Sequence, residues 1–113
     1  LAVQAAGAAP FARAFERGFD RLEPVTARTV ASAIRIGDPA SYARAVRSIR
    51  ETRGRVVAIS DACLLEAKAV IDRAGIGCEP ASAAAVAGVV VFYRAFLVMT
   101  FDEILAEVLG ATH

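Results

Sequence analysis

The fold is decided by residues 56–61, which read Val56-Val57-Ala58-Ile59-Ser60-Asp61. Four apolar residues, three of them β-branched, predict a short buried strand. Ser60 or Asp61 is a typical N-cap, so a helix should start directly after the strand. Apolar residues at helical spacing continue that helix until Gly75 ends it: Leu64, Leu65, Ala67, Val70 and Ile71. A strand that leads directly into an amphipathic helix indicates an α/β fold.

Toward the amino terminus the same order occurs again. Residues 1–4 predict a second strand, residues 5–10 form a bend of small side chains, and Phe11, Phe15 and Phe19 share one face of a helix. Residues 26–34 predict a short helix, and residues 36–41 a turn whose Asp38 or Ser41 caps a helix that ends near Gly54. We therefore predict an α/β fold of alternating strands and helices around a mostly parallel sheet.

Toward the carboxyl terminus the pattern changes. Residues 76–78 predict a brief extended piece, Glu79-Pro80 breaks it, and residues 81–88 begin a helix. Residues 89–93 predict a strand, and the capping box Thr100-Phe101-Asp102-Glu103 predicts a last helix that Gly110 ends. We expect two parts: residues 1–88, and a tail of unclear origin, residues 89–113, made of a strand and then a helix.

Composition excludes several classes of function. The chain has 113 residues, 57% of them hydrophobic, and a net charge of +1. The basic residues are spread out, which argues against nucleic-acid binding. Residues 81–99 are almost long enough to cross a bilayer, but Arg94 interrupts them, so we predict no membrane partner. The apolar content and the opening at Leu1 predict a piece of a larger protein, with faces that await a partner.

Cysteine and histidine usage favours no metal site. Cys63 and Cys78 lie fifteen residues apart, which is neither a metal-ligand nor a redox spacing, and we predict two buried free thiols in a reducing cytosol rather than a disulfide. The single histidine, His113, stands at the terminus without a second ligand near it.

Two bends are the candidate site. Ligands of open α/β sheets bind at the carboxyl ends of strands, and we expect the bends at residues 5–10 and 79–82 each to follow a strand. Both are also readable as ordinary turns, in which Glu79 or Ser82 only caps a helix.

Three segments resemble the threonine synthases, which are pyridoxal-phosphate-dependent enzymes of fold type II. They occur in that family's order and with similar separation, at residues 3–10 (VQAAGAAP), 29–41 (TVASAIRIGDPAS) and 77–88 (GCEPASAAAVAG). The second, with AIRIG followed by DPAS, is the most specific. The resemblance covers residues 1–88 and implies the carboxy-terminal part of such an enzyme, within its large domain.

The resemblance also implies a cofactor site and a reaction. In the family, a small-residue bend passes close to the pyridoxal ring, so the implied cofactor-binding residues are Ala6, Gly7, Ala8, Ala9, Glu79 and Ser82. The implied parent is a cytoplasmic carbon–oxygen lyase that uses pyridoxal phosphate to convert O-phosphohomoserine and water into threonine and phosphate. Its partners would be that small substrate and the rest of the parent chain, and a homodimer is left open.

The family's catalytic lysine has no counterpart in this chain. Family catalysis uses a lysine within a Ser-Phe-Lys-Asp-type motif and a Gly-Asn-rich phosphate loop, and neither motif occurs here. The only lysine, Lys68, stands in the middle of a predicted helix, so we assign no catalytic residue and expect the isolated chain to be inactive. Three other readings stay open: a non-catalytic fragment or recombined domain, a piece of a related lyase such as threonine dehydratase, and a peripheral membrane or partner-helix module.

Overall fold

A computed structural model describes residues 1–110, apart from the side chains at positions 96, 101 and 106. His113, which we expected to bind no metal, lies outside the described residues. Two parallel strands, β1 (Ala2–Ala5) and β2 (Val56–Ile59), form the sheet in the register Ala2–Val56 to Ala5–Ile59. The predicted α/β fold with a parallel sheet is confirmed.

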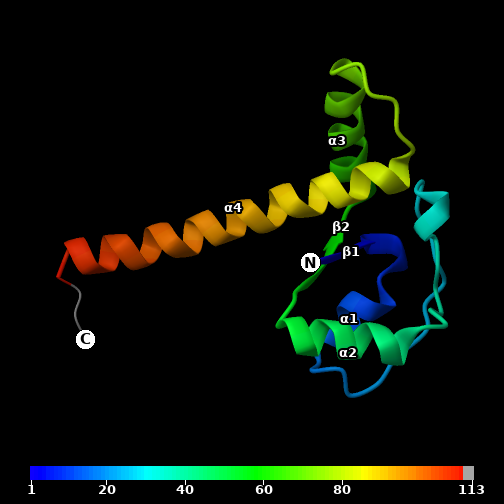
Figure 1. Ribbon diagram of the computed structural model, residues 1–113, viewed down its shortest axis with the longest axis horizontal. Helices are drawn as coiled ribbons and strands as arrows, with labels where there is room; N and C mark the ends of the chain where they lie inside the picture. The colour runs from blue at the N-terminus through cyan, green and yellow to red at the C-terminus, as the bar shows by residue number, and fades with distance from the viewer. Residues whose placement is uncertain (111–113) are drawn as a thin grey trace.

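Helices cover both faces of this small sheet. On one side lie α1 (Pro10–Glu16) and α2 (Tyr42–Thr52), and on the other lie α3 (Asp61–Arg73) and the start of α4 (Pro80–Val108) (Figure 1). Side chains of a strand alternate between its two faces, so Val56 and Ile59 belong to different hydrophobic clusters.

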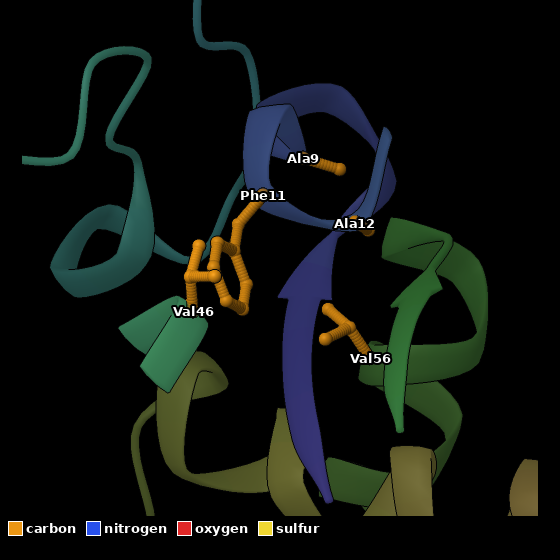
Figure 2. Close-up of a cluster of buried hydrophobic side chains, with 5 residues drawn as sticks. All are labelled: Ala9, Phe11, Ala12, Val46 and Val56. Atoms are coloured by element: carbon orange, nitrogen blue, oxygen red, sulfur yellow. The ribbon is translucent and has the colours of Figure 1, made fainter. Parts of the chain in front are cut away.

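The first cluster lies between the sheet and helices α1 and α2. Its buried members are Ala9, Phe11, Ala12, Val46 and Val56 (Figure 2). Phe19 also joins it, with its ring centroid 5.1 Å from that of Phe11, but not as part of a helix as the spacing predicted. Helix α1 ends at Glu16, and Gly18, at a φ of 74°, turns the chain back so that Phe19 reaches the cluster.

The second cluster lies on the opposite face, against α3 and α4. It contains Ala31, Ile59, Leu64, Ala84 and Ala87, with Leu64 fully buried. Gly88 shows how closely α4 approaches the sheet, because a Cβ atom there would clash with the Val3 side chain. Helix α4 therefore needs small residues along this part of its length.

The predicted strand at residues 89–93 is wrong. These residues lie inside α4, which runs unbroken for 29 residues from Pro80 and also contains the predicted separate helix after Thr100. The valines favour a strand locally, but a helix already begun at an alanine-rich segment gains a hydrogen bond with each residue added. Helix α4 thus crosses the expected boundary at residue 88 and projects away from the body (Figure 1).

Several smaller predictions are corrected too. Residues 26–34 form no α-helix, only the 3₁₀ turn Ser32–Ile34, and residues 76–78 lie outside the sheet, with Ile76 62% exposed. Cys63 and Cys78 are free thiols as predicted, but Cys63 is exposed rather than buried, because the inward face of α3 is taken by Leu64.

One helix is long and apolar enough to cross a membrane. It is the stretch of α4 from Pro80 to Leu105, and only 19% of its most apolar window is buried within the described residues. A buried helix of a soluble protein passes the same test of length and composition, so this property alone decides nothing.

Candidate functional site

The candidate site begins where the two parallel strands end. Ala5 and Ile59 are partners in the register, so the bend after β1 and the start of α3 after β2 lie at one edge of the sheet. Ser60 caps α3 as predicted, because its Oγ accepts a hydrogen bond from the Cys63 N–H at 3.2 Å. This edge is the place where open α/β sheets bind ligands.

The bend after β1 is the 3₁₀ turn Ala6–Ala8 followed by Ala9. Ala6 and Gly7 are exposed, whereas Ala8 is fully buried and Ala9 packs into the first cluster (Figure 2). Of the four predicted cofactor-binding residues in this bend, two are therefore open to a ligand and two support the bend from behind.

Gly7 has a structural role of its own. Its carbonyl oxygen accepts the Arg28 N–H at 2.8 Å, and a Cβ atom on Gly7 would lie in contact with the Arg28 carbonyl oxygen. The backbone of Arg28 therefore fills the space where a side chain at position 7 would lie. This packing explains the glycine even if no ligand binds at the bend.

A cluster of hydrogen bonds at the same edge, called here the polar lock, connects Thr29, Val30 and Ala31 with Asp61. The sequence patterns did not predict it. The Asp61 carboxylate accepts the Thr29 hydroxyl at 2.5 Å and the Val30 N–H at 3.0 Å, and the Thr29 hydroxyl accepts the Ala31 N–H at 3.2 Å. Thr29 is buried, so the lock satisfies a polar group that would otherwise be costly to bury. Residues 28–31 are thus tied across the edge of the sheet to Gly7 and to Asp61. The sequence indicated Asp61 only as a possible helix N-cap, because no local pattern predicts its hydrogen bond with Thr29, 32 residues away.

The second predicted bend, residues 79–82, does not follow a strand. It connects the end of α3 with the start of α4, and Glu79 is the N-cap residue of α4 with an extended backbone. The Glu79 carbonyl oxygen accepts the N–H groups of Ser82 and Ala83 at 3.0 and 3.2 Å, and no side-chain cap bond is formed. The Glu79 and Ser82 side chains are both exposed.

The two bends pack against opposite faces of the sheet. Ala9 belongs to the first cluster, and Ala81 packs on the second. Among the residues from 1 to 110, no hydrogen bond or ion pair joins residues 5–10 to residues 79–82. The predicted site residues are therefore positioned separately, by different parts of the core.

Lys68 is held in its charged ammonium form, which is not the form that reacts as an amine. Its Nζ lies 2.6 Å from the Asp72 Oδ2 on α3, and this hydrogen bond raises the pKa of Lys68. A Schiff base needs the uncharged amine, whereas Asp72 stabilises the ammonium form.

Pyridoxal phosphate, which the resemblance implies, finds only part of a site among the described residues. Ala6 and Gly7 expose backbone without bulky side chains, against which a flat ring could lie. One surface hollow lies around Arg50, Arg53 and Arg55 and another around Cys63, Glu66 and Arg94, and neither of these includes a predicted site residue. The described residues therefore supply only part of a site for the cofactor.

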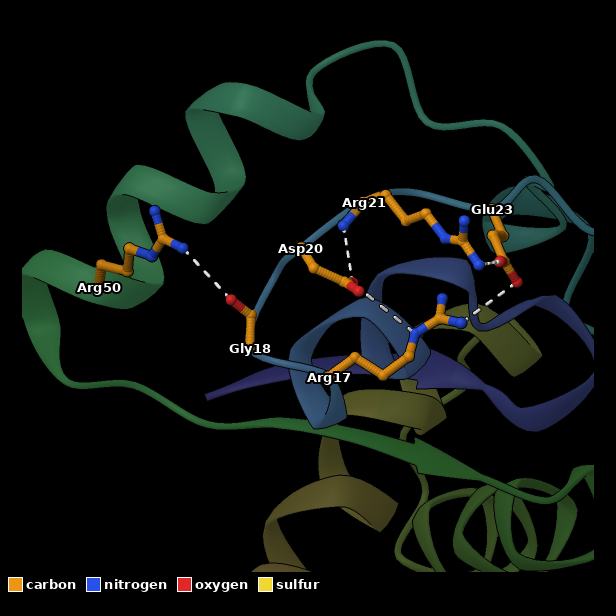
Figure 3. Close-up of polar contacts among 6 residues, drawn as sticks. All are labelled: Arg17, Gly18, Asp20, Arg21, Glu23 and Arg50. Carbon is orange, nitrogen blue, oxygen red and sulfur yellow. Dashed lines mark hydrogen bonds and ion pairs between the residues drawn. The ribbon is translucent and has the colours of Figure 1, made fainter.

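The polar contacts on the other face of the sheet are structural. Glu23 forms ion pairs with Arg17 at 3.2 Å and with Arg21 at 2.7 Å (Figure 3). Arg50 donates a hydrogen bond to the Gly18 carbonyl oxygen at 3.3 Å. The hydrogen bond and charge of Arg17, aided by Arg21, lower the pKa of Glu23. These contacts hold the loop after α1 against α2.

Comparison with known proteins agrees with the resemblance. The family model described as "Pyridoxal-phosphate dependent enzyme" matches residues 1–96. The chain is similar to proteins named threonine synthase from Methanosarcina acetivorans (42% identical over 88 residues, 76% of this chain and 22% of the relative) and Mycobacterium leprae (44% over 90 residues, 78% and 23%). The relative of the same name from Synechocystis is 41% identical over 90 residues, 78% of this chain and 22% of the relative.

The similarity covers most of this chain but only a small part of each relative. The chain spans about a fifth of the length of these relatives, whereas the family match covers most of the chain itself. The similarity to threonine synthases inferred from the three segments is confirmed. This chain belongs to the family of pyridoxal-phosphate-dependent enzymes.

Proposed function

We propose that this chain is part of a threonine synthase, which converts O-phosphohomoserine and water into threonine and phosphate with pyridoxal phosphate. The observation that carries the proposal is the similarity to proteins of that name, 41–44% identical over more than three quarters of the chain. The parent would be a cytoplasmic biosynthetic lyase, active as a homodimer or a monomer on a small substrate.

The chain contributes a wall of the cofactor cleft rather than its reactive amine. When bound, pyridoxal phosphate supplies the electron sink for the reaction. Ala6 and Gly7 offer open backbone to one side of it, while Ala8 and Ala9, both buried, hold the bend in place. Glu79 and Ser82, both exposed at the start of α4, belong to the segment that packs on the other face of the sheet and would border a separate part of the cleft. The lysine and the phosphate loop come from other segments of the parent.

A non-catalytic fragment is the second candidate function. Lys68 agrees with this reading for the isolated chain, because the one lysine is a surface residue of α3 paired with Asp72 and lies outside both bends. A related lyase, such as a threonine dehydratase, would share the cleft wall and differ in segments outside this chain.

A chimera tests the proposal directly. In the Mycobacterium leprae threonine synthase, the matching segment is replaced by residues 1–88 of this chain, and phosphate release from O-phosphohomoserine is measured. We expect activity within about tenfold of the parent relative, since an intact cleft preserves transition-state binding. The matched control carries Gly7→Val in the same chimera, which forces residues 28–31 away from the edge and should abolish activity. A folded, cofactor-loaded chimera without phosphate release would refute the proposal.

Borohydride reduction separates the enzyme from the inert fragment. The isolated chain is mixed with pyridoxal phosphate, reduced, and mapped by mass spectrometry, beside Lys68→Arg as a control. We expect no defined label at Lys68. Stoichiometric labelling of Lys68 would show that the isolated chain forms a covalent adduct by itself.

A further inference from the structure

The Thr29 hydroxyl is a buried group that connects separate parts of the chain. It donates a hydrogen bond to Asp61 Oδ1 at 2.5 Å and accepts one from the Ala31 N–H at 3.2 Å, so it acts as donor and acceptor at once. Ala31 is fully buried in the second cluster, and Asp61 is the first residue of α3. One hydroxyl therefore fastens the segment at residues 28–31 both to the core and to the start of α3.

Asp61 uses both of its carboxylate oxygens in the polar lock. Oδ1 accepts the Thr29 hydroxyl, and Oδ2 accepts the Val30 N–H at 3.0 Å. The first turn of a helix favours any acidic side chain, but these two bonds need two acceptor oxygens on one short side chain. The polar lock is therefore a specific arrangement of donors and acceptors, beyond the general preference for negative charge at this position.

The segment that the polar lock holds is also the segment that contacts the bend after β1. The Arg28 N–H donates to the Gly7 carbonyl oxygen at 2.8 Å, and a Cβ atom on Gly7 would clash with the Arg28 carbonyl oxygen. The backbone of residue 28 thus lies directly against Gly7. Because Arg28 immediately precedes Thr29, a shift of Thr29 would move the group on which Gly7 rests.

The ends of the bend are fixed by other contacts. At its start, Gln4 Oε1 accepts the Ala12 N–H at 2.9 Å, which ties β1 to the first turn of α1. Within the bend, Ala8 is fully buried. Ala6 and Gly7 are exposed between these fixed points, and the bond from Arg28 joins this exposed part to the polar lock.

We propose that Thr29 is a positioning residue, which acts through residue 28 to set the backbone of Ala6 and Gly7 for the cofactor. The inference rests on the proposed function, in which this backbone borders pyridoxal phosphate. Thr29 itself touches neither cofactor nor substrate. Its effect is on placement, and a displacement of about 1 Å in a binding or catalytic group costs up to about a hundredfold in rate.

Hydrogen exchange of the 113-residue chain tests the link from Thr29 to the bend. Thr29→Val keeps the shape of the side chain and removes both bonds of the hydroxyl. The Arg28 N–H should then exchange about tenfold faster relative to the amides of β2, whereas Thr29→Ser, which keeps the hydroxyl, should change this ratio by less than about threefold. An unchanged ratio in Thr29→Val would overturn the proposal, whatever reaction the parent protein performs.

A control separates placement from lost stability. Ile49 is partly buried against the first cluster and lies next to Gly54, near the amino ends of the strands and away from the bend. Ile49→Ala should destabilise the fold without changing the exchange of the Arg28 N–H relative to β2. Equal changes in Ile49→Ala and Thr29→Val would reduce the role of Thr29 to general stability and would overturn the proposal.

Cofactor binding by the chimera with the Mycobacterium leprae relative tests the functional part. The dissociation constant of pyridoxal phosphate is measured from the absorbance of the bound cofactor. Thr29→Val should weaken binding by about tenfold, and Thr29→Ser and Ile49→Ala by less than about threefold. Asp61→Asn offers one acceptor oxygen in place of two, and should weaken binding by about fivefold even if Thr29→Val does not fold.

The two proposals fail in different ways. A chimera that binds the cofactor equally well with and without Thr29→Val and Asp61→Asn would overturn the role of Thr29 and leave the proposed function standing. An unmodified, folded chimera that binds no cofactor would refute the proposed function and the role of Thr29 with it.

Discussion

The two halves of α4 have similar apolar sequences and opposite surroundings. From Pro80 to Gly88 the helix lies against the sheet, and Ala83, Ala84 and Ala87 are at most 5% exposed. From Val89 the same helix first borders α3, where Val90, Val91 and Arg94 line a hollow, and then extends beyond the body with larger apolar side chains exposed (Figure 1). Burial along α4 therefore depends on the surface that each segment packs against: small alanines let the near half approach the sheet, whereas the far half borders only α3, and only at its start.

The largest effect on stability is expected from a substitution in the second cluster, against which the near half of α4 packs. Leu64→Ala should lower the free energy of unfolding by about 3 kcal/mol, since Leu64 is fully buried beside Ala84 and Ala87 and its loss leaves a cavity. Leu65→Ala, at a side chain that is 44% exposed, should cost less than about 1 kcal/mol. Urea unfolding followed by circular dichroism measures both, and equal losses would mean that α4 does not seal this cluster.

A substitution at the junction of the halves should have the next largest effect. In Gly88→Val even the Cβ atom would clash with Val3 Cγ2, and overpacking of this kind costs about 2 kcal/mol. Ala95→Val adds bulk to an exposed residue of the far half and should change stability by less than about 0.5 kcal/mol. Thermal unfolding of the two variants compares the halves directly, and a neutral Gly88→Val would place α4 farther from the sheet.

Disruption of the polar lock at the edge of the sheet should have the third largest effect on stability. Asp61→Ala leaves the Thr29 hydroxyl and the Val30 N–H without their acceptor, which should cost about 1.5 kcal/mol. Amide hydrogen exchange should show lost protection at Val30. Asp102→Ala in the far half, which removes an exposed carboxylate, is the control and should leave both stability and Val30 exchange unchanged.

The smallest effect is electrostatic and concerns Glu23, which is exposed. Its pKa is lowered from 4.5 in the folded chain, mainly by Arg17, so the stabilisation is present above the unfolded pKa and is lost as the pH falls through the folded value. Arg17→Gln should therefore remove a shallow decline of stability below about pH 4.5. The proton titration of Glu23, followed by NMR, checks this change, and an unchanged midpoint in Arg17→Gln would assign the shift to another group.

Local patterns predicted much of the body correctly. The strand Val56–Ile59, the Ser60 cap and helix α3 appear where the sequence placed them, because each depends on neighbouring residues. The strand expected at residues 89–93 failed because β-branched residues follow the conformation that a helix has already begun. The brief extended segment expected before Glu79 is not part of the sheet either, and Glu79 follows the loop after α3.

The α/β class, the family and the small-residue bends could be inferred from the amino-acid sequence, since periodicity, caps and segment order are carried by neighbouring residues. Three features became visible only in the folded chain: the hydrogen bond from Thr29 to Asp61, the contact of Gly7 with the Arg28 carbonyl, and the burial of α4 along one half but not the other. These features join residues far apart in the chain. They depend on which surfaces meet after folding, and no local pattern encodes that meeting.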